Sequence, residues 1–213
     1  MIKNVIFDVN NVLRVLNNEP LENYLPQSVK GRYARDFKNI YSQDYFKKYF
    51  NNSIAYQHDL GLISEADLVS RLSERFGEPA EILKTMLEAR CQKKHNTILK
   101  PVLKFAQKLK SKGYRIFILS NMGKDAATAL TKMLGKKNFH DIVFSCDVHM
   151  CKPSREFYEY ALDRFNIIPE ETLFVDDLQT NLNTFESLGG YIYLFNPHNI
   201  EKSIKNIEYL LKQ

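Results

Sequence analysis

The stretch "KPSREFYEYALDRFNIIPEETLFVDD", residues 152–177, places a helix pattern directly before a buried-strand pattern. Phe157, Ala161 and Phe165 recur at helical spacing and predict a single apolar face. Pro153 is expected in the first turn of this helix, where a backbone N–H is not needed. The run "TLFV" is short and apolar, which predicts a buried strand. A helix that leads into a buried strand is the repeating unit of a parallel α/β sheet.

The same alternation extends over most of the chain after residue 98. Strands are predicted at 5–7, 114–121, 141–145, 172–177 and 191–195, and helices at 101–113, 124–135, 153–165, 180–189 and from 200 onward. Repeated units of this kind form a parallel sheet with helices on both faces, so the sequence predicts an α/β fold.

Residues 15–95 lack this alternation and look helical throughout. The clearest helix is "SEADLVSRLSERFG", in which Ser64 is the expected N-cap and Asp67 occupies the capping-box position. Leu68 and Leu72 share one face of it.

Two parts are therefore predicted. The first is a discontinuous α/β core domain formed by residues 1–14 and 96–213, and the second is an inserted all-α cap domain formed by residues 15–95. The total of 213 residues is ample to bury a core.

Composition and charge narrow the class of function. The net charge of +5 comes without a basic stripe interleaved with aromatic residues, so a nucleic acid partner is not expected. No stretch approaches the ~20 apolar residues of a membrane helix, and a membrane partner is not expected either. The start "MIKNVIFD" runs straight into a strand without a signal-peptide pattern, which predicts a cytoplasmic protein.

The cysteines Cys91, Cys146 and Cys151 form no CxxC pair and fit a reducing compartment. Cys151 is adjacent to Lys152 in the sequence, and a neighbouring cation can make a thiol reactive. We expect it to be a solvent-facing bystander rather than a reactive thiol.

Polar side chains gather where the predicted strands end. They are Asp8 after the first strand, Ser120 and Asn121 after the second, Lys152 in the loop after the third, and Asp176 and Asp177 after the fourth. Because ligands of open parallel sheets bind beyond the carboxyl ends of the strands, we expect these groups to converge on one edge. Each residue alone has an ordinary explanation, such as a helix cap or a surface lysine.

Three converging carboxylates do not stay ionised together without a cation, and oxygen ligands of this kind suit magnesium. A lysine and a Ser–Asn pair beside the metal would hold the oxygens of an anion, for which phosphate is the natural candidate. One carboxylate is then free to act as a nucleophile.

These residues carry a resemblance to the haloacid dehalogenase-like (HAD) superfamily, in the branch with a helical cap inserted after the first strand. Four segments match its motifs in order, "FDVNNVL", "ILSNM", "CKPSREFY" and "FVDDLQTN", and the resemblance covers essentially the whole chain. It implies a Rossmann-like core and a magnesium-dependent phosphatase that forms a phospho-aspartyl intermediate on a small-molecule phosphate ester.

The resemblance also implies roles for single residues. Asp8 would be the nucleophile, Lys152 would stabilise the phosphate and the intermediate, and Ser120 with the Asn121 backbone would bind phosphate. The metal would be held by Asp8, Asp176, Asp177 and the backbone carbonyl of Asn10, with Asn181 at its usual place.

Asn10 departs from the usual pattern, because phosphatases of this family usually carry there a second aspartate that serves as general acid and base. An amide cannot donate or accept that proton, and such help is typically worth ~10²–10⁴-fold in rate. The sequence also resembles a subgroup with "FDxGNV"-like first motifs that lacks this aspartate. Similar members hydrolyse sugar 1-phosphates, whose anomeric oxygen leaves more readily.

Two other functions stay open at this point. One is a catalytically weak or inactive binding or regulatory protein, and the other is a 2-haloacid dehalogenase, although a metal-free dehalogenase has no use for the adjacent Asp176 and Asp177. Five residues could face a substrate, although residues of these types more often have a surface or packing role. They are Arg14, Arg35, Tyr56, His58 and His149.

Overall fold

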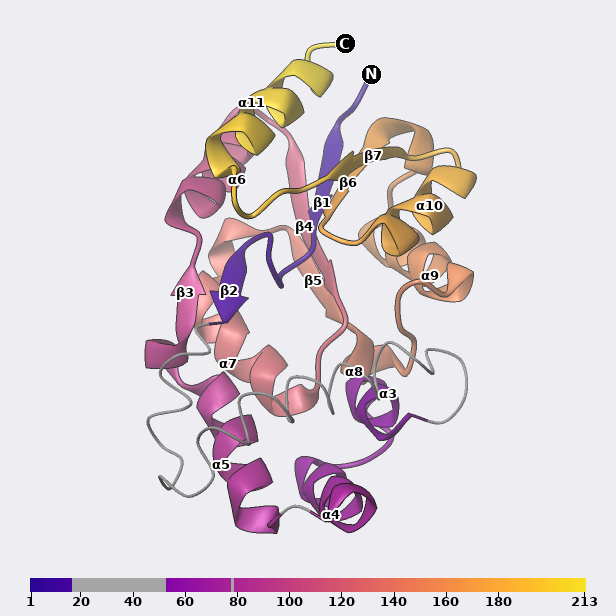
Figure 1. Cartoon of the computed structure of the whole chain (residues 1–213). Coiled ribbons are helices and arrows are strands. Elements are labelled where there is room, and N and C mark those ends of the chain that lie inside the picture. The colour runs from indigo at the N-terminus through magenta and orange to yellow at the C-terminus, as the bar shows by residue number, and fades with distance from the viewer. Residues whose placement is uncertain (17–52, 78) are drawn as a thin grey trace.

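The computed structural model describes residues 1–16, 53–77 and 79–213 (Figure 1). Five strands form a parallel sheet in the order β5-β4-β1-β6-β7. They are β1 (Asn4–Phe7), β4 (Arg115–Ser120), β5 (Asp141–Phe144), β6 (Thr172–Asp176) and β7 (Tyr191–Leu194). The central strand β1 is buried along its whole length. The predicted α/β fold is confirmed.

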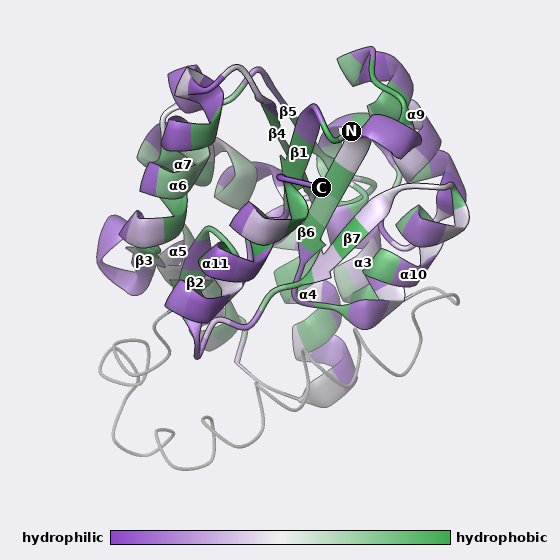
Figure 2. Ribbon diagram, turned by 90° about the horizontal axis from the view of Figure 1, so that it is seen from above, coloured by the Kyte–Doolittle hydropathy of each residue, from purple (hydrophilic) through white to green (hydrophobic). Residues whose placement is uncertain are grey.

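Helices cover both faces of this sheet. One face packs against α6 (Lys100–Ser111), α7 (Lys124–Leu134) and α11 (Ile200–Leu210), and the other against α9 (Arg155–Phe165) and α10 (Gln179–Ser187). Successive strand residues point to opposite faces, so Phe7 packs with the first group and Ile6 with the second. Figure 2 shows the apolar strands between helices whose polar sides face outward.

The helix predicted to contain Pro153 starts later than expected. Ser154 is the N-cap of α9, and the Ser154 N–H donates to the Cys151 carbonyl at 2.9 Å. Pro153 lies inside this turn, and the Lys152–Pro153 peptide bond is cis. The expectation that Pro153 occupies the first helical turn is therefore wrong, because the turn ends only at Ser154.

A short ribbon connects the sheet to the helical part of the chain. It is formed by β2 (Arg14–Leu16) and β3 (Asn96–Ile98), which pair antiparallel. The expectation that residues 15–95 are helical throughout is therefore wrong at its first residues. Segments distant in sequence satisfy each other's backbone groups here, and no local pattern reveals such a pairing.

Beyond the ribbon, the described residues form α3 (Ile54–Asp59), α4 (Glu65–Phe76) and α5 (Ala80–Cys91). The predicted capping box is confirmed, since the Asp67 N–H donates to Ser64 Oγ and the Ser64 N–H donates to Asp67 Oδ2, each at 3.1 Å. Leucines of α4 and α5 form a small core separate from the sheet clusters. The division into core and cap domains at the stated boundaries stays a prediction.

Shorter helical elements are α8 (Ser145–Val148), η1 (Lys93–His95), η2 (Lys136–Asn138) and η3 (Pro169–Glu171). None of the helices in residues 1–16, 53–77 and 79–213 has the length and apolar character needed to cross a membrane.

Cys151 does not face solvent, contrary to expectation, because only 1% of its surface is exposed. Burial and the nearby Asp59 carboxylate raise the pKa of its thiol well above the usual range. Such a thiol stays protonated and is a poor nucleophile.

Candidate functional site

Three carboxylates meet at the carboxyl ends of the neighbouring strands β1 and β6. Strand β1 ends at Phe7, which pairs with Val175 of β6, so Asp8 and Asp176 follow side by side. The Asp8 N–H donates to the Val175 carbonyl at 2.9 Å and fixes this register. Asp8, Asp176 and Asp177 each place a carboxylate oxygen within 4.8 Å of the other two. The predicted convergence is observed.

Lys152 lies among these acids and is only 2% exposed. Its Nζ donates to Asp8 Oδ1 at 2.8 Å and to Asp176 Oδ2 at 2.6 Å. Burial alone would lower the pKa of Lys152, yet the charges of Asp176 and Asp8 outweigh it and raise the pKa above its usual range. The ammonium therefore stays charged and bridges the two acids.

One ammonium does not balance three carboxylates in this setting. Burial raises the pKa of Asp8, Lys152 opposes this, and the neighbouring Asp176 charge adds to it. Burial and the Asp8 charge raise the pKa of Asp177 to about 6. A cation would relieve this crowding. The donor set consists only of oxygens, which fits a hard ion such as Mg²⁺.

Asp176 is held by the first turn of α10. The Leu178 N–H donates to Asp176 Oδ1 at 2.8 Å, and Asn181 Nδ2 lies 3.1 Å from each carboxylate oxygen. Tyr158 in turn donates its hydroxyl to the Asn181 carbonyl at 2.9 Å. These contacts fix the Asp176 carboxylate between Lys152 and the helix.

Ser120, the last residue of β4, and Asn121, which follows it, have different roles. Ser120 is fully buried beside Asp8, and its hydroxyl has no well-formed hydrogen bond within the described residues. The Asn121 side chain donates to the Lys152 carbonyl and accepts from the Lys152 N–H, each at 2.8 Å. Ser120 thus places its hydroxyl beside Asp8, while Asn121 fixes the loop that carries Lys152.

Asn11 is a site residue that the sequence reasoning missed. It has φ of 56°, and its amide donates to Asp177 Oδ2 at 2.9 Å. Asparagine tolerates this left-handed backbone better than most residues, so two asparagines after a buried strand were the available signal. Asn10 lies in the same turn and is partly buried.

Two of the residues considered as facing a substrate, His149 and His58, make contacts where α3 approaches α8 and the start of α7. His149 donates its Nδ1–H to the Leu60 carbonyl at 2.8 Å, because a carbonyl only accepts. A Cβ added to Gly123 would lie 2.1 Å from the His58 ring, so these two residues are in close contact. The other candidates have varied positions: Arg14 is buried in β2, Tyr56 is partly buried in α3, and Arg35 lies outside the described residues.

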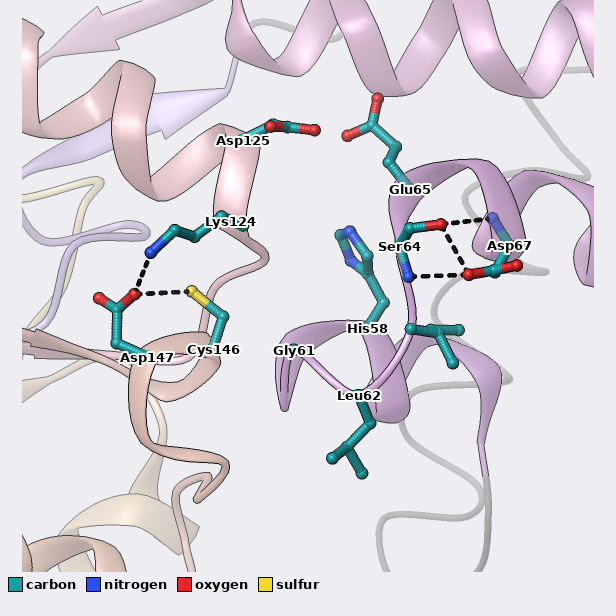
Figure 3. Close-up of a pocket in the computed structure, with 11 residues that line it drawn as sticks. His58, Gly61, Leu62, Ser64, Glu65, Asp67, Lys124, Asp125, Cys146 and Asp147 are labelled. Carbon is teal, nitrogen blue, oxygen red and sulfur yellow. Dashed lines mark hydrogen bonds and ion pairs between the residues drawn. The ribbon is translucent and has the colours of Figure 1, made fainter.

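The turn between α3 and α4 also lines a pocket of about 530 Å³ against α7 and α8 (Figure 3). His58 lies between the two walls of the pocket. Lys124, the first residue of α7, forms an ion pair with Asp147 of α8. The described residues that line this pocket do not include Asp8, Lys152 or Asp176. The pocket is therefore distinct from the carboxylate site.

The chain is similar to several known proteins in sequence and in fold. The chain is similar to bifunctional epoxide hydrolase 2 of Mus musculus, with 30% identity over 117 residues, but the match covers 53% of this chain and only 21% of the mouse protein. It is also similar to sesquiterpene phosphatase astK of Aspergillus oryzae, with 26% identity over 135 residues, 62% of this chain and 67% of that protein.

A solved HAD family enzyme of Bacteroides thetaiotaomicron, in complex with magnesium and inorganic phosphate, shares the fold. Its TM-score is 0.69 at 24% identity, over 92% of this chain and 96% of that chain. A family model described as haloacid dehalogenase-like hydrolase matches residues 2–189. The chain therefore belongs to the haloacid dehalogenase-like hydrolase family.

Proposed function

We propose that this hydrolase is a magnesium-dependent phosphatase that acts on a small phosphate monoester, with sugar phosphates as the favoured class. The observation that carries the proposal is the buried Lys152 ammonium between Asp8 and Asp176, with Asp177 as a third acid. The phosphatase from Aspergillus oryzae and the magnesium and phosphate bound by the Bacteroides enzyme support it.

The metal would be held by the carboxylates of Asp8, Asp176 and Asp177 together with the Asn10 backbone carbonyl. When bound, Mg²⁺ supplies positive charge that offsets the negative oxygens of a phosphate ester. The protein contributes the rest of the positive charge through Lys152, which is fixed in place by its two ion pairs.

Asp8 is the proposed nucleophile. Its Oδ1 accepts from Lys152, so Oδ2 would attack phosphorus. The new bond joins Asp8 to phosphorus, the bond from phosphorus to the ester oxygen breaks, and the alcohol oxygen takes up a proton from solvent water. Water then cleaves the acyl phosphate, which releases inorganic phosphate and restores Asp8. Ser120 and the Asn121 backbone would hold the phosphoryl oxygens.

Asn10 shapes which esters would react. Its amide has no acidic proton, so the alcohol must leave without the general acid that is typically worth ~10²–10⁴-fold. An anomeric oxygen is a better leaving group than an ordinary alcohol oxygen. Sugar 1-phosphates are therefore the favoured substrates under this proposal.

The two alternatives make different demands on the site. A metal-free 2-haloacid dehalogenase would not need three converging carboxylates. A binding or regulatory protein would not need Asp8 to remain reactive. The crowding of negative charge around Lys152 favours a metal-dependent function over the dehalogenase. Turnover separates the phosphatase from the binding or regulatory protein.

A panel of phosphate esters tests the proposal, with release of inorganic phosphate measured in Mg²⁺ and in EDTA. We expect turnover that requires Mg²⁺, highest on sugar 1-phosphates, and loss of turnover in Asp8→Asn while the circular dichroism spectrum is kept. Activity on 2-haloacids in EDTA would favour the dehalogenase, and binding of phosphate esters without turnover would favour the regulatory protein.

A further inference from the structure

We propose that Asn11 is a positioning residue for the metal site, acting through Asp177. This inference rests on the proposed magnesium-dependent function and extends it to a side chain that is not itself a metal ligand. The contact that carries it is the hydrogen bond of 2.9 Å from Asn11 Nδ2 to Asp177 Oδ2.

This bond joins the two loops that supply the carboxylates. Asp8 belongs to the loop after β1, and Asp177 to the loop after β6. Two other contacts join the same parts of the chain: the Asp8 N–H donates to the Val175 carbonyl, and Lys152 donates to both Asp8 and Asp176. The hydrogen bond from the Asn11 amide is a third contact between the two loops, on the exposed side of the site, and it sets the orientation of the Asp177 carboxylate.

The backbone that carries this amide is itself fixed. The Asn11 N–H donates to the Arg14 carbonyl at 2.7 Å, and the N–H groups of Leu13 and Arg14 donate to the Val9 carbonyl at 2.9 Å each. Arg14 then continues into the β2–β3 ribbon. Asn11 therefore presents its amide from a hydrogen-bonded turn.

Asparagine meets two demands at this position. The φ of 56° disfavours most side chains, whereas glycine and asparagine accept it. Glycine, however, has no donor for Asp177, and aspartate of the same shape presents an acceptor instead. The choice of asparagine thus combines the turn with a hydrogen bond to a metal-site carboxylate.

Two variants test this role with MgCl₂ as the probe, by calorimetric titration and thermal unfolding at a pH near 8 in phosphate-free buffer. Asn11→Gly keeps the backbone conformation and removes the amide, so Mg²⁺ should bind ~10-fold more weakly, at the lower end of the effect typical for losing a partner of a metal-binding group. Its melting temperature without metal should match that of the wild type, and saturating Mg²⁺ should restore turnover.

Asn11→Asp should have the opposite signature. It faces Asp177 with a second carboxylate, so the metal-free protein should melt earlier, and the rise in melting temperature on adding Mg²⁺ should exceed that of the wild type. The matched control is Asn166→Gly, because Asn166 also has a left-handed φ, of 51°, but caps α9 away from the site. It should leave Mg²⁺ affinity unchanged.

The outcomes separate the two proposals. If the wild type binds Mg²⁺ and Asn11→Gly binds it within twofold of the same affinity, the role of Asn11 is overturned while the proposed function stands. If the wild type binds no Mg²⁺, both are overturned.

Discussion

Asn121 and Lys152 form two reciprocal hydrogen bonds, in which one amide side chain pairs with both backbone groups of the other residue at 2.8 Å. The bonds connect the end of β4 to the loop before α9. The loop position of Lys152 is therefore set by a residue outside that loop.

Replacing Asn121 with alanine should weaken both stability and turnover. The variant leaves two partly buried backbone groups of Lys152 unpaired, which should lower the free energy of unfolding by ~1–3 kcal/mol. Urea denaturation and phosphate release measure the two effects. The control is Asn138→Ala, which also removes a hydrogen bond from a side-chain amide, here to the Leu134 carbonyl, but should leave turnover unchanged. Wild-type turnover in Asn121→Ala would show that Lys152 does not depend on it.

Gly123 and His58 should be coupled energetically. Gly123 has an ordinary backbone conformation as the N-cap of α7, so alanine adds no backbone strain, yet its Cβ would collide with the His58 ring. Gly123→Ala should destabilise the protein by ~1–3 kcal/mol through overpacking. In the His58→Ala background the same change should be nearly neutral. Equal effects in both backgrounds, measured as a double-mutant cycle, would contradict the contact.

Asp177 should make stability and metal binding respond to pH in opposite ways. Its pKa rises from 3.8 to about 6 on folding, so the metal-free folded state keeps the proton longer than the unfolded chain. Stability from this group is then present near pH 4 and is lost as the pH rises through about 6. Mg²⁺ favours the ionised form and should bind more tightly over the same range.

Melting temperatures in EDTA and in Mg²⁺ from about pH 4 to pH 8 check both trends. Asp177→Asn should gain stability relative to the wild type as the pH rises in EDTA. A difference between the two proteins that does not change with pH would contradict the raised pKa.

Restoring an acid at position 10 should help most where the leaving group is poor. Asn10→Asp should speed hydrolysis of an alkyl phosphate more than that of an aryl phosphate or a sugar 1-phosphate, with a ceiling of roughly 10²–10⁴-fold. Steady-state rates on the two classes, at several pH values, provide the comparison. Equal gains on both would mean that another group supplies the proton.

The sequence predicted the sheet and most of the carboxylate site because both follow from short-range patterns. Apolar runs mark the strands, and residues at the carboxyl ends of neighbouring parallel strands must lie close together, as Asp8 and Asp176 do. Contacts between distant segments were less accessible. The β2–β3 ribbon and the contact of His58 with Gly123 depend on how the inserted helices return to the sheet.

Some features of single side chains near the site were not predicted, because they also depend on contacts between distant segments. The burial of Cys151 follows from the packing of its loop. The amide of Asn11 reaches Asp177 because the Asn11 backbone adopts a left-handed conformation in the turn. Neither feature has a periodic signal in the sequence. The prediction for Pro153 used a local rule for helix starts, but Pro153 lies in a turn that ends at Ser154, before the helix begins.

The place of β1 in the sheet has a consequence for synthesis on the ribosome. Asn4 pairs with Arg115 on one side and with Thr172 on the other, so β1 is translated long before either neighbour exists. Until β6 emerges, this apolar strand has exposed edges, which are prone to pairing with other chains. Nascent chains released between β4 and β6 should therefore bind chaperones and aggregate more readily than the complete sequence.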